Sequence, residues 1–231
     1  PYIPVSAKDA RVNDPMTVVP QNHSTVITQT LLELESETGK SVLANVAESL
    51  GLTEGQTANA LHGAQIDGVA LLNRANKRGD AFIIGDDTGL GKGRTAAAAM
   101  LAAKRRGLLP LFVTKSPDLW GDMLRDIVAV TENATDLESR ELLSVTDQGK
   151  ANTETKRATR FDISDAVKDG TLSRSWPKIV KGAENVSSKL EALEEAVDNF
   201  IETGEMVVTD YSSEKDGKAI SPFGIAWTYS Q

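Results

Sequence analysis

The sequence predicts an α/β fold in which a parallel sheet is preceded by an extended arm and a helical N-terminal region. Apolar residues recur at helical spacing between residues 24 and 76. Two strand-plus-helix patterns then follow one another, over 81–104 and 108–130. Parallel strands need a crossover connection, usually a helix, so two consecutive β–α units indicate a parallel, right-handed sheet.

The N-terminal part is predicted to consist of an extended arm over residues 1–22 and a helical region over residues 23–62. Prolines and a lack of apolar periodicity indicate extended chain and loop in the arm. In the helical region, capping residues and terminal glycines delimit successive helices. These are a helix that ends at Gly39, a second between Ser41 and Gly51, and a third that begins after Thr53.

Residues 63–130 are predicted to hold the first β–α units of an ATPase lobe, with a fourth helix over 61–76 leading into them. The apolar run 81–84 is predicted to be a short buried strand. A glycine-rich turn with Lys92 follows, and then an alanine-rich segment that strongly favours helix. This order suits a nucleotide triphosphate, because loop N–H groups and the positive end of the helix dipole attract phosphates.

The loop departs from the usual P-loop pattern at two positions. Asp86 stands where glycine or alanine is usual, and Gly93 stands where a serine or threonine would bind Mg²⁺. Thr88, Thr95 or water could supply the missing ligand, and the sequence does not choose among them. The alternative, a glycine-rich turn with an incidental lysine, leaves unexplained the glycines that alternate around Lys92.

A glutamine upstream of the loop is a candidate for base recognition. Gln65 precedes Lys92 by 27 positions, and a glutamine side chain can accept a hydrogen bond from adenine N6 while donating one to N7. Such pairing would select ATP over GTP, whereas the alternative is an exposed helical glutamine. The predicted nucleotide-binding residues are Gln65, Asp87, Thr88, Gly89, Leu90, Gly91, Lys92, Gly93 and Arg94.

Composition narrows the class of protein. The 231 residues carry a formal net charge of −8, which disfavours a uniformly basic nucleic-acid binder. Cysteine is absent, which excludes disulfides, cysteine-ligated zinc and thiol catalysis. His23 and His62 are isolated, so surface or capping roles are expected rather than metal ligation. No apolar run reaches membrane-spanning length and no signal peptide is apparent, so an intracellular location is expected.

The C-terminal half carries weaker signals. Residues 131–205 are predicted to be a polar and helical insertion outside the sheet, with a helix over 186–200. Residues 206–231 are predicted to contribute further strands, from apolar runs at 205–211 and 225–229.

With these residues in view, the chain resembles the strawberry-notch group of superfamily-two helicase-like ATPases, and more narrowly their phage and bacterial relatives of the defence-against-restriction type. The matching pieces are 1–6 with 18–22, the Gln65 segment, 85–94 with its Gly-Lys-Gly-Arg, 113–119 with Asp122, Arg125 and Asp126, and 227–231. The resemblance covers most of the chain except 131–205.

The resemblance implies an ATP-dependent motor on nucleic acid, of which this chain would be an N-terminal part. Lys92 would act as the catalytic residue by stabilising charge on the transferring phosphoryl group, with ATP and Mg²⁺ as cofactors. Thr114, Lys115 and Ser116 would contact a nucleic-acid backbone, expected to be that of DNA, without reading bases. The family's acidic box is absent, so the expected fold is α/β with an incomplete RecA-like P-loop lobe, and the chain alone is expected to hydrolyse ATP negligibly.

Two other functions remain open. The resemblance also suggests protection of injected phage DNA from restriction, in the host cytoplasm or in the virion. In that case the chain could be a structural or virion-associated interaction module that docks on phage or anti-restriction partners, with an incomplete nucleotide site. A P-loop kinase or GTPase is disfavoured because Gly93 removes the hydroxyl on which those enzymes rely.

Overall fold

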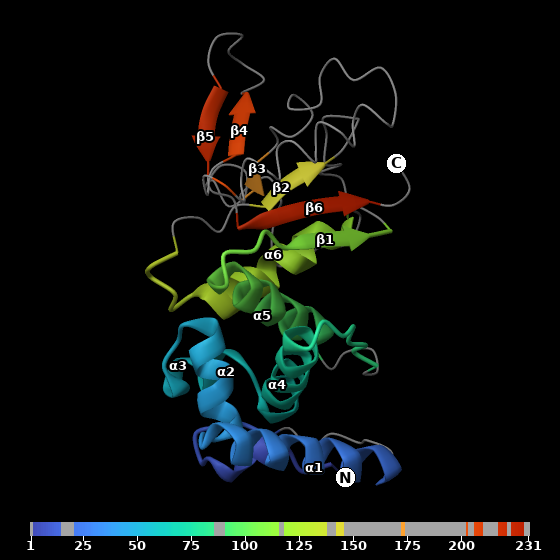
Figure 1. Cartoon of the computed structure of the whole chain (residues 1–231). Coiled ribbons are helices and arrows are strands. Elements are labelled where there is room, and N and C mark those ends of the chain that lie inside the picture. The colour runs from blue at the N-terminus through green and yellow to red at the C-terminus, as the bar shows by residue number, and fades with distance from the viewer. Residues whose placement is uncertain are drawn as a thin grey trace. The chain divides into compact units, whose positions relative to one another are not determined.

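The computed structural model describes residues 2–14, 21–85, 91–115, 118–137, 142–145, 172–173, 202, 206–209, 217–220 and 223–228. The chain divides into two compact units, Pro1–Arg105 with Ala129–Thr135, and Arg106–Val128 with Asp136–Gln231. Helices build the first unit and a parallel sheet lies in the second, as Figure 1 shows. The predicted α/β fold class is therefore confirmed.

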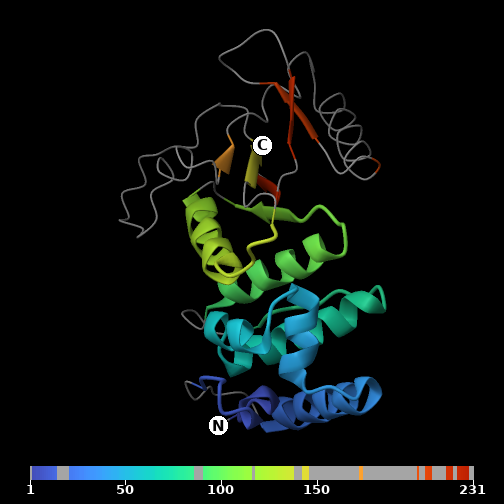
Figure 2. The same cartoon turned by 90° about the vertical axis from the view of Figure 1, so that its left-hand side faces the viewer.

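Within its described residues, the first unit holds a short 3₁₀ helix and five α-helices. They are η1 (Val5–Lys8), α1 (Gln21–Thr38), α2 (Val42–Leu50), α3 (Glu54–Ala60), α4 (Gly63–Lys77) and α5 (Lys92–Arg105). Helix α4 contacts both α2 and α5, and the pair α2 and α4 can be followed in Figures 1 and 2. The core between them is apolar, with Leu43, Leu50, Ile66, Val69 and Leu101 at most 1% exposed. The helices predicted between residues 24 and 76 are confirmed.

The predicted caps set the ends of α2 and α3. Ser41 Oγ accepts a hydrogen bond from the Ala44 N–H at 3.1 Å, and α2 ends at Gly51 with φ 65°. Thr53 and Gln56 form a reciprocal capping box at the start of α3. Each satisfies helix-terminal groups that would otherwise lack partners, which explains why these short helices begin and end at these residues.

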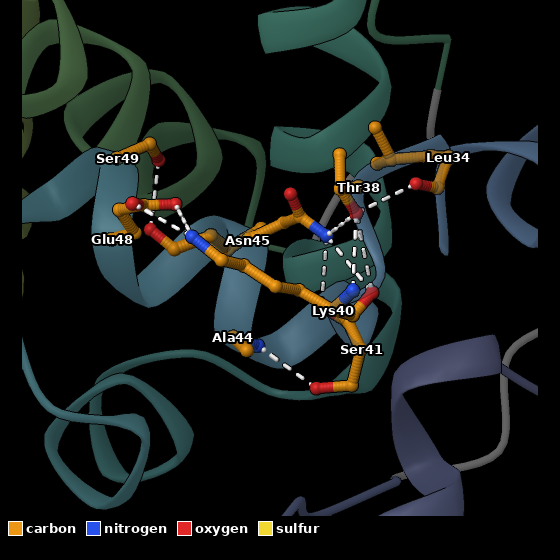
Figure 3. Close-up of polar contacts among 9 residues, drawn as sticks. Leu34, Thr38, Lys40, Ser41, Ala44, Asn45, Glu48 and Ser49 are labelled. Atoms are coloured by element: carbon orange, nitrogen blue, oxygen red, sulfur yellow. Dashed lines mark hydrogen bonds and ion pairs between the residues drawn. The ribbon is translucent and has the colours of Figure 1, made fainter. Parts of the chain in front are cut away.

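A polar hub closes the connection between α1 and α2 (Figure 3). Asn45 Nδ2 donates to Thr38 Oγ1 at 2.9 Å, to the Lys40 carbonyl at 3.1 Å and to the Ser41 carbonyl at 3.0 Å. Lys40 Nζ also pairs with the Glu48 carboxylate at 2.8 Å. The hub holds the tight turn at Gly39, whose φ is 66°.

The second unit is organised around a parallel sheet. Its strands are β1 (Leu111–Thr114), β2 (Leu142–Val145), β3 (Leu172–Ser173) and β6 (Gly224–Thr228), in the order β1-β6-β2-β3. Leu111 pairs with Ile225 and Leu142 with Gly224, so the strands run in parallel register. Helix α6 (Asp118–Thr131) follows β1, which confirms the second predicted β–α unit.

The prediction of an insertion outside the sheet over the whole of 131–205 was wrong, because β2 and β3 both fall inside this range and belong to the parallel sheet. Strand β2 pairs with β6 on one side and β3 on the other. A run of four residues is too short to show a periodic signal, so only pairing with distant strands reveals it. The helix expected over 186–200 lies outside the described residues.

The predicted strand over 81–84 is also absent. Residues 81–85 have no regular secondary structure, and Ile83 is 88% exposed. An apolar run becomes a strand only where another strand accepts its backbone hydrogen bonds, and residues 81–85 pair with none. Their backbone leads directly into the glycine-rich loop.

The last predicted strands divide between two sheets. Strand β4 (Met206–Thr209) pairs antiparallel with β5 (Gly217–Ile220), so this hairpin is separate from the parallel sheet. Strand β6 instead enters the parallel sheet, where the Ile225 N–H donates to the Pro110 carbonyl at 2.9 Å. Buried Phe223 and Ala226 anchor it.

Candidate nucleotide-binding site

The described part of the glycine-rich loop leads straight into α5. Gly91 has φ 76°, a conformation that favours glycine, and Lys92 is the first residue of the helix. The Gly91 carbonyl accepts the N–H of Arg94 at 2.9 Å and of Thr95 at 3.4 Å, which closes the first turn. Lys92 therefore lies at the positive end of α5. Asp86, Asp87, Thr88, Gly89 and Leu90 lie outside the described residues.

Gln65 lies against this end of the loop. Its Nε2 donates a hydrogen bond to the Gly91 carbonyl at 3.0 Å, across 26 positions of sequence. Its Oε1 accepts the His62 N–H at 3.1 Å, so one side chain both caps α4 and holds Gly91. The glutamine is buried, at 6% exposure, and not the exposed helical residue of the alternative interpretation.

A side chain at position 91 would collide with Gln65. A Cβ built on Gly91 would meet Gln65 Nε2, so the glutamine would have to move away from the Gly91 carbonyl that it binds. Gly91 is therefore constrained twice, by its backbone conformation and by the glutamine beside it. Each atom of the amide group keeps one further hydrogen-bonding position, and adenine recognition by Gln65 stays a prediction.

Arg94 and Thr95 are turned to the body of the first unit. Arg94 Nη1 donates to the Ala60 carbonyl, the last of α3, at 3.3 Å. Thr95 is 2% exposed, and its Cγ2 lies 3.6 Å from a Cβ built on Gly68 of α4. A buried threonine packed on a neighbouring helix is a poor candidate for the missing Mg²⁺ ligand, which leaves Thr88 or water.

A buried carboxylate that the sequence did not reveal lies one half-turn beyond Gln65. Asp67 is 2% exposed and accepts the Tyr2 hydroxyl at 2.5 Å, the Val5 N–H at 2.7 Å and the Ser6 N–H at 3.1 Å. The N–H groups belong to the first turn of η1, which has no other cap. The only sequence signal was the acidic residue itself on an apolar helix face.

Burial is the largest influence on the pKa values of Asp67 and Tyr2. It raises the pKa of Asp67 above its ordinary value, against the opposing effect of the three hydrogen bonds from the arm. Burial, followed by the nearby Asp67 charge, also raises the pKa of Tyr2. Tyr2 therefore stays protonated and donates to Asp67.

Further contacts fasten the arm to the first residue of α4. Ser6 Oγ donates to the Gly63 carbonyl at 3.0 Å, and the Gly63 N–H donates to the Asn13 carbonyl at 2.9 Å. A Cβ on Gly63 would lie 2.9 Å from the Pro4 ring. The arm that the sequence predicted as extended thus contains η1 and packs closely on α4.

The predicted nucleic-acid residues belong to the second unit, at the carboxyl end of β1. Thr114 is 6% exposed, whereas Lys115 is exposed; Ser116 lies outside the described residues. The carboxyl edge of a parallel sheet is where such folds place their ligands. Lys115 is the better placed of the two described side chains to contact one.

The described residues contain neither a metal-binding cluster nor a membrane-spanning helix. They contain no group of three or more histidine, cysteine, aspartate or glutamate side chains that could hold a metal ion. Within the same residues no helix has the length and apolar character needed to cross a membrane.

Comparison with protein families shows which family the chain belongs to. The sequence profile of the family described as P-loop containing NTP hydrolase pore-1 matches residues 22–215, which is most of the chain. The chain belongs to this family. The match shows a P-loop NTP hydrolase domain, and such domains generally bind a nucleotide with Mg²⁺. No curated protein and no solved structure matches the chain.

The range matched by the NTP hydrolase pore-1 family spans the unusual loop. Gly93 in place of serine or threonine made the strict pattern fail, although the glycines, Lys92 and the helix start remain. Gln65 and the Gly91–Lys92 step both lie inside the matched range.

Proposed function

We propose that this chain binds MgATP at its P-loop and is the nucleotide-binding part of a helicase-like protein that moves on nucleic acid. The observation that carries the nucleotide site is the junction of Gly91 and Lys92 at the start of α5, braced by Gln65. A glycine with positive φ, the positive end of a helix dipole and a lysine at the first helical position suit a triphosphate.

The chain's own groups have distinct tasks in this proposal. Lys92 neutralises charge on the β- and γ-phosphates as a point charge, and the positive end of the α5 dipole adds to the attraction. Gln65 selects adenine, using the hydrogen-bonding positions that Gly91 and His62 leave open. Mg²⁺ bound with the nucleotide would supply further charge neutralisation.

The proposal also includes binding to nucleic acid. It is supported by the resemblance to strawberry-notch-type and defence-against-restriction proteins, and by exposed Lys115 after β1. Contacts from this position would go to phosphates and would position the strand without reading its sequence. Protection of phage DNA would be one use of such an activity.

Calorimetric titration of the chain with a non-hydrolysable ATP analogue and Mg²⁺ tests the nucleotide site. Lys92→Ala should weaken binding about 10- to 100-fold, because a charged hydrogen bond is worth about 1.5–3 kcal/mol. Lys77→Ala is the matched control: Lys77 is an exposed lysine at the end of α4 in the same unit and should bind like the unmodified chain.

Equal affinity of Lys92→Ala and the unmodified chain would contradict the proposal. Absence of binding by the unmodified chain would contradict it as well, and would favour the interaction-module function. A GTP analogue that binds as tightly as the ATP analogue would contradict the assignment of Gln65 alone.

A further inference from the structure

The N-terminal arm and the glycine-rich loop are linked through a single turn of helix. Gly63 and Asp67 on α4 receive the arm, and Gln65, between them, holds Gly91. The sequence places these groups far apart, since Tyr2 and Asp67 are separated by 65 positions and Gln65 and Gly91 by 26. The fold alone brings them into one connected network.

We propose that Asp67 and the arm residues that it binds are positioning residues for the nucleotide site. They fix the first turn of α4, and this turn sets where Gln65 meets the loop. The inference rests on the proposed nucleotide-binding function, and it assigns to the arm a role in that site.

The first step concerns how firmly Asp67 holds Tyr2, Val5 and Ser6, a set of contacts that we call the clamp. A buried carboxylate that accepts three hydrogen bonds holds its donors firmly, because every partner lost would leave a polar group buried without compensation. The contacts at Gly63 act on the same turn from both its carbonyl and its N–H. The close approach of Pro4 leaves Gly63 little freedom to shift.

The second step is the transfer to the loop. A helical turn is rigid, so a displacement at Gly63 or Asp67 also displaces Gln65. Gln65 Nε2 shares the Gly91 carbonyl with the N–H groups of Arg94 and Thr95. Loss of the glutamine contact would therefore loosen the start of α5, where Lys92 sits.

The test compares two hubs of three hydrogen bonds in the same unit. Asp67→Ala removes the clamp, and Asn45→Ala removes the hub at the turn between α1 and α2, whose partners are Thr38, Lys40 and Ser41 (Figure 3). Both variants should lose thermal stability. Asp67→Asn keeps one oxygen, which can accept the Tyr2 hydroxyl and the Val5 N–H that share Oδ2, while its amide nitrogen faces the Ser6 N–H. It should recover part of the loss.

Two readouts distinguish positioning from stability. In Asp67→Ala, amide hydrogen exchange at Arg94 and Thr95 should quicken, and affinity for the Mg²⁺-bound ATP analogue should fall, each by about 5- to 30-fold. In Asn45→Ala both should stay as in the unmodified chain. Equal exchange and affinity in the two variants at matched stability would overturn the inference.

The exchange measurement separates this inference from the proposed function. If the unmodified chain bound no nucleotide, the proposed function would fail, and exchange at Arg94 and Thr95 would still decide whether the clamp controls the start of α5. Faster exchange in Asp67→Ala alone would support the link, and unchanged exchange would reject it.

Discussion

At the scale of single residues, Gly91 is the position with the least freedom in the described part of the site. Its φ of 76° favours glycine, and Gln65 Nε2 occupies the space that a Cβ would need. The sequence showed only that a glycine precedes Lys92. The structure adds that two independent constraints meet at this glycine.

Gly91→Ala should therefore destabilise the chain by about 1–3 kcal/mol, through left-handed strain and a displaced hydrogen bond, and should weaken MgATP-analogue binding. Urea unfolding and calorimetry measure the two effects. Gly68→Ala is the control, because its Cβ would meet Thr95 Cγ2 at an ordinary 3.6 Å inside a helix. Gly68→Ala should leave the free energy of unfolding unchanged or raise it. Equal losses of stability in Gly91→Ala and Gly68→Ala would contradict the constraint on Gly91.

Asp67 makes a second prediction at this scale, on pH. Because burial raises its pKa, the folded chain holds this proton more tightly than the unfolded chain. Its contribution to stability is then full below the unfolded pKa, about 4, and is lost as pH rises through the folded pKa. Urea unfolding should show this as a pH-dependent difference between two proteins. The unfolding free energy of the unmodified chain minus that of Asp67→Asn should fall as pH rises from about 4 through the folded-state pKa of Asp67. A difference that grew with pH would mean that the arm's hydrogen bonds outweigh burial.

At the scale of elements, arginines of α5 close the ends of two earlier helices. Arg94 reaches the last carbonyl of α3, and Arg105 Nε donates to the Leu50 carbonyl at the end of α2, at 3.0 Å. A positive charge at a helix C-terminus is favourable because it opposes the negative end of the dipole. Helix α5 is thus tied at both of its ends to helices that precede it in the sequence.

Gly51 and Gly39 have nearly the same φ, so alanine substitutions at the two positions can be compared to measure what the Arg105 contact contributes. Gly51 has φ 65° and its Cβ would lie 2.7 Å from Arg105 Nε, whereas Gly39 has φ 66° and no atom within 4 Å of its Cβ. Each alanine substitution should cost about 1–2 kcal/mol for the left-handed backbone. Gly51→Ala should cost about 0.5–1.5 kcal/mol more, as the lost hydrogen bond, in chemical denaturation. Equal costs would show that Arg105 simply moves aside.

At the scale of the whole molecule, charge limits how nucleic acid can bind. With a net charge of −8, attraction to the proposed nucleic-acid partner would have to come from local groups such as Lys115. Lys115→Ala should weaken binding of a fluorescent single-stranded oligonucleotide similarly for every sequence, and lower the salt slope by about 1. Fluorescence anisotropy over a range of salt concentrations measures both. Lys77→Ala is again the control, and an unchanged slope in Lys115→Ala would exclude the contact.

The predictions made from sequence succeeded where local chemistry decides the structure. Ser41 and Thr53 cap helices because their side chains bond to the next turn, and Gly51 ends α2 because it accepts positive φ. Such effects act over three or four residues, so they are visible in the sequence.

The predictions failed where distant strands decide. The run 81–84 is apolar but pairs with no strand, and β2 was assigned to an insertion although it lies between β6 and β3. Strand formation needs a partner's backbone groups, and no short run of sequence specifies that partner.

The sequence by itself determined that this chain carries a P-loop on an α/β fold, because glycines, Lys92 and the helix that follows form a continuous local pattern. Only the tertiary structure decided that Gln65 braces Gly91 and that Asp67 binds the arm beside it. These contacts join groups separated by tens of residues, and the packing of α4 against η1 and α5 brings them together.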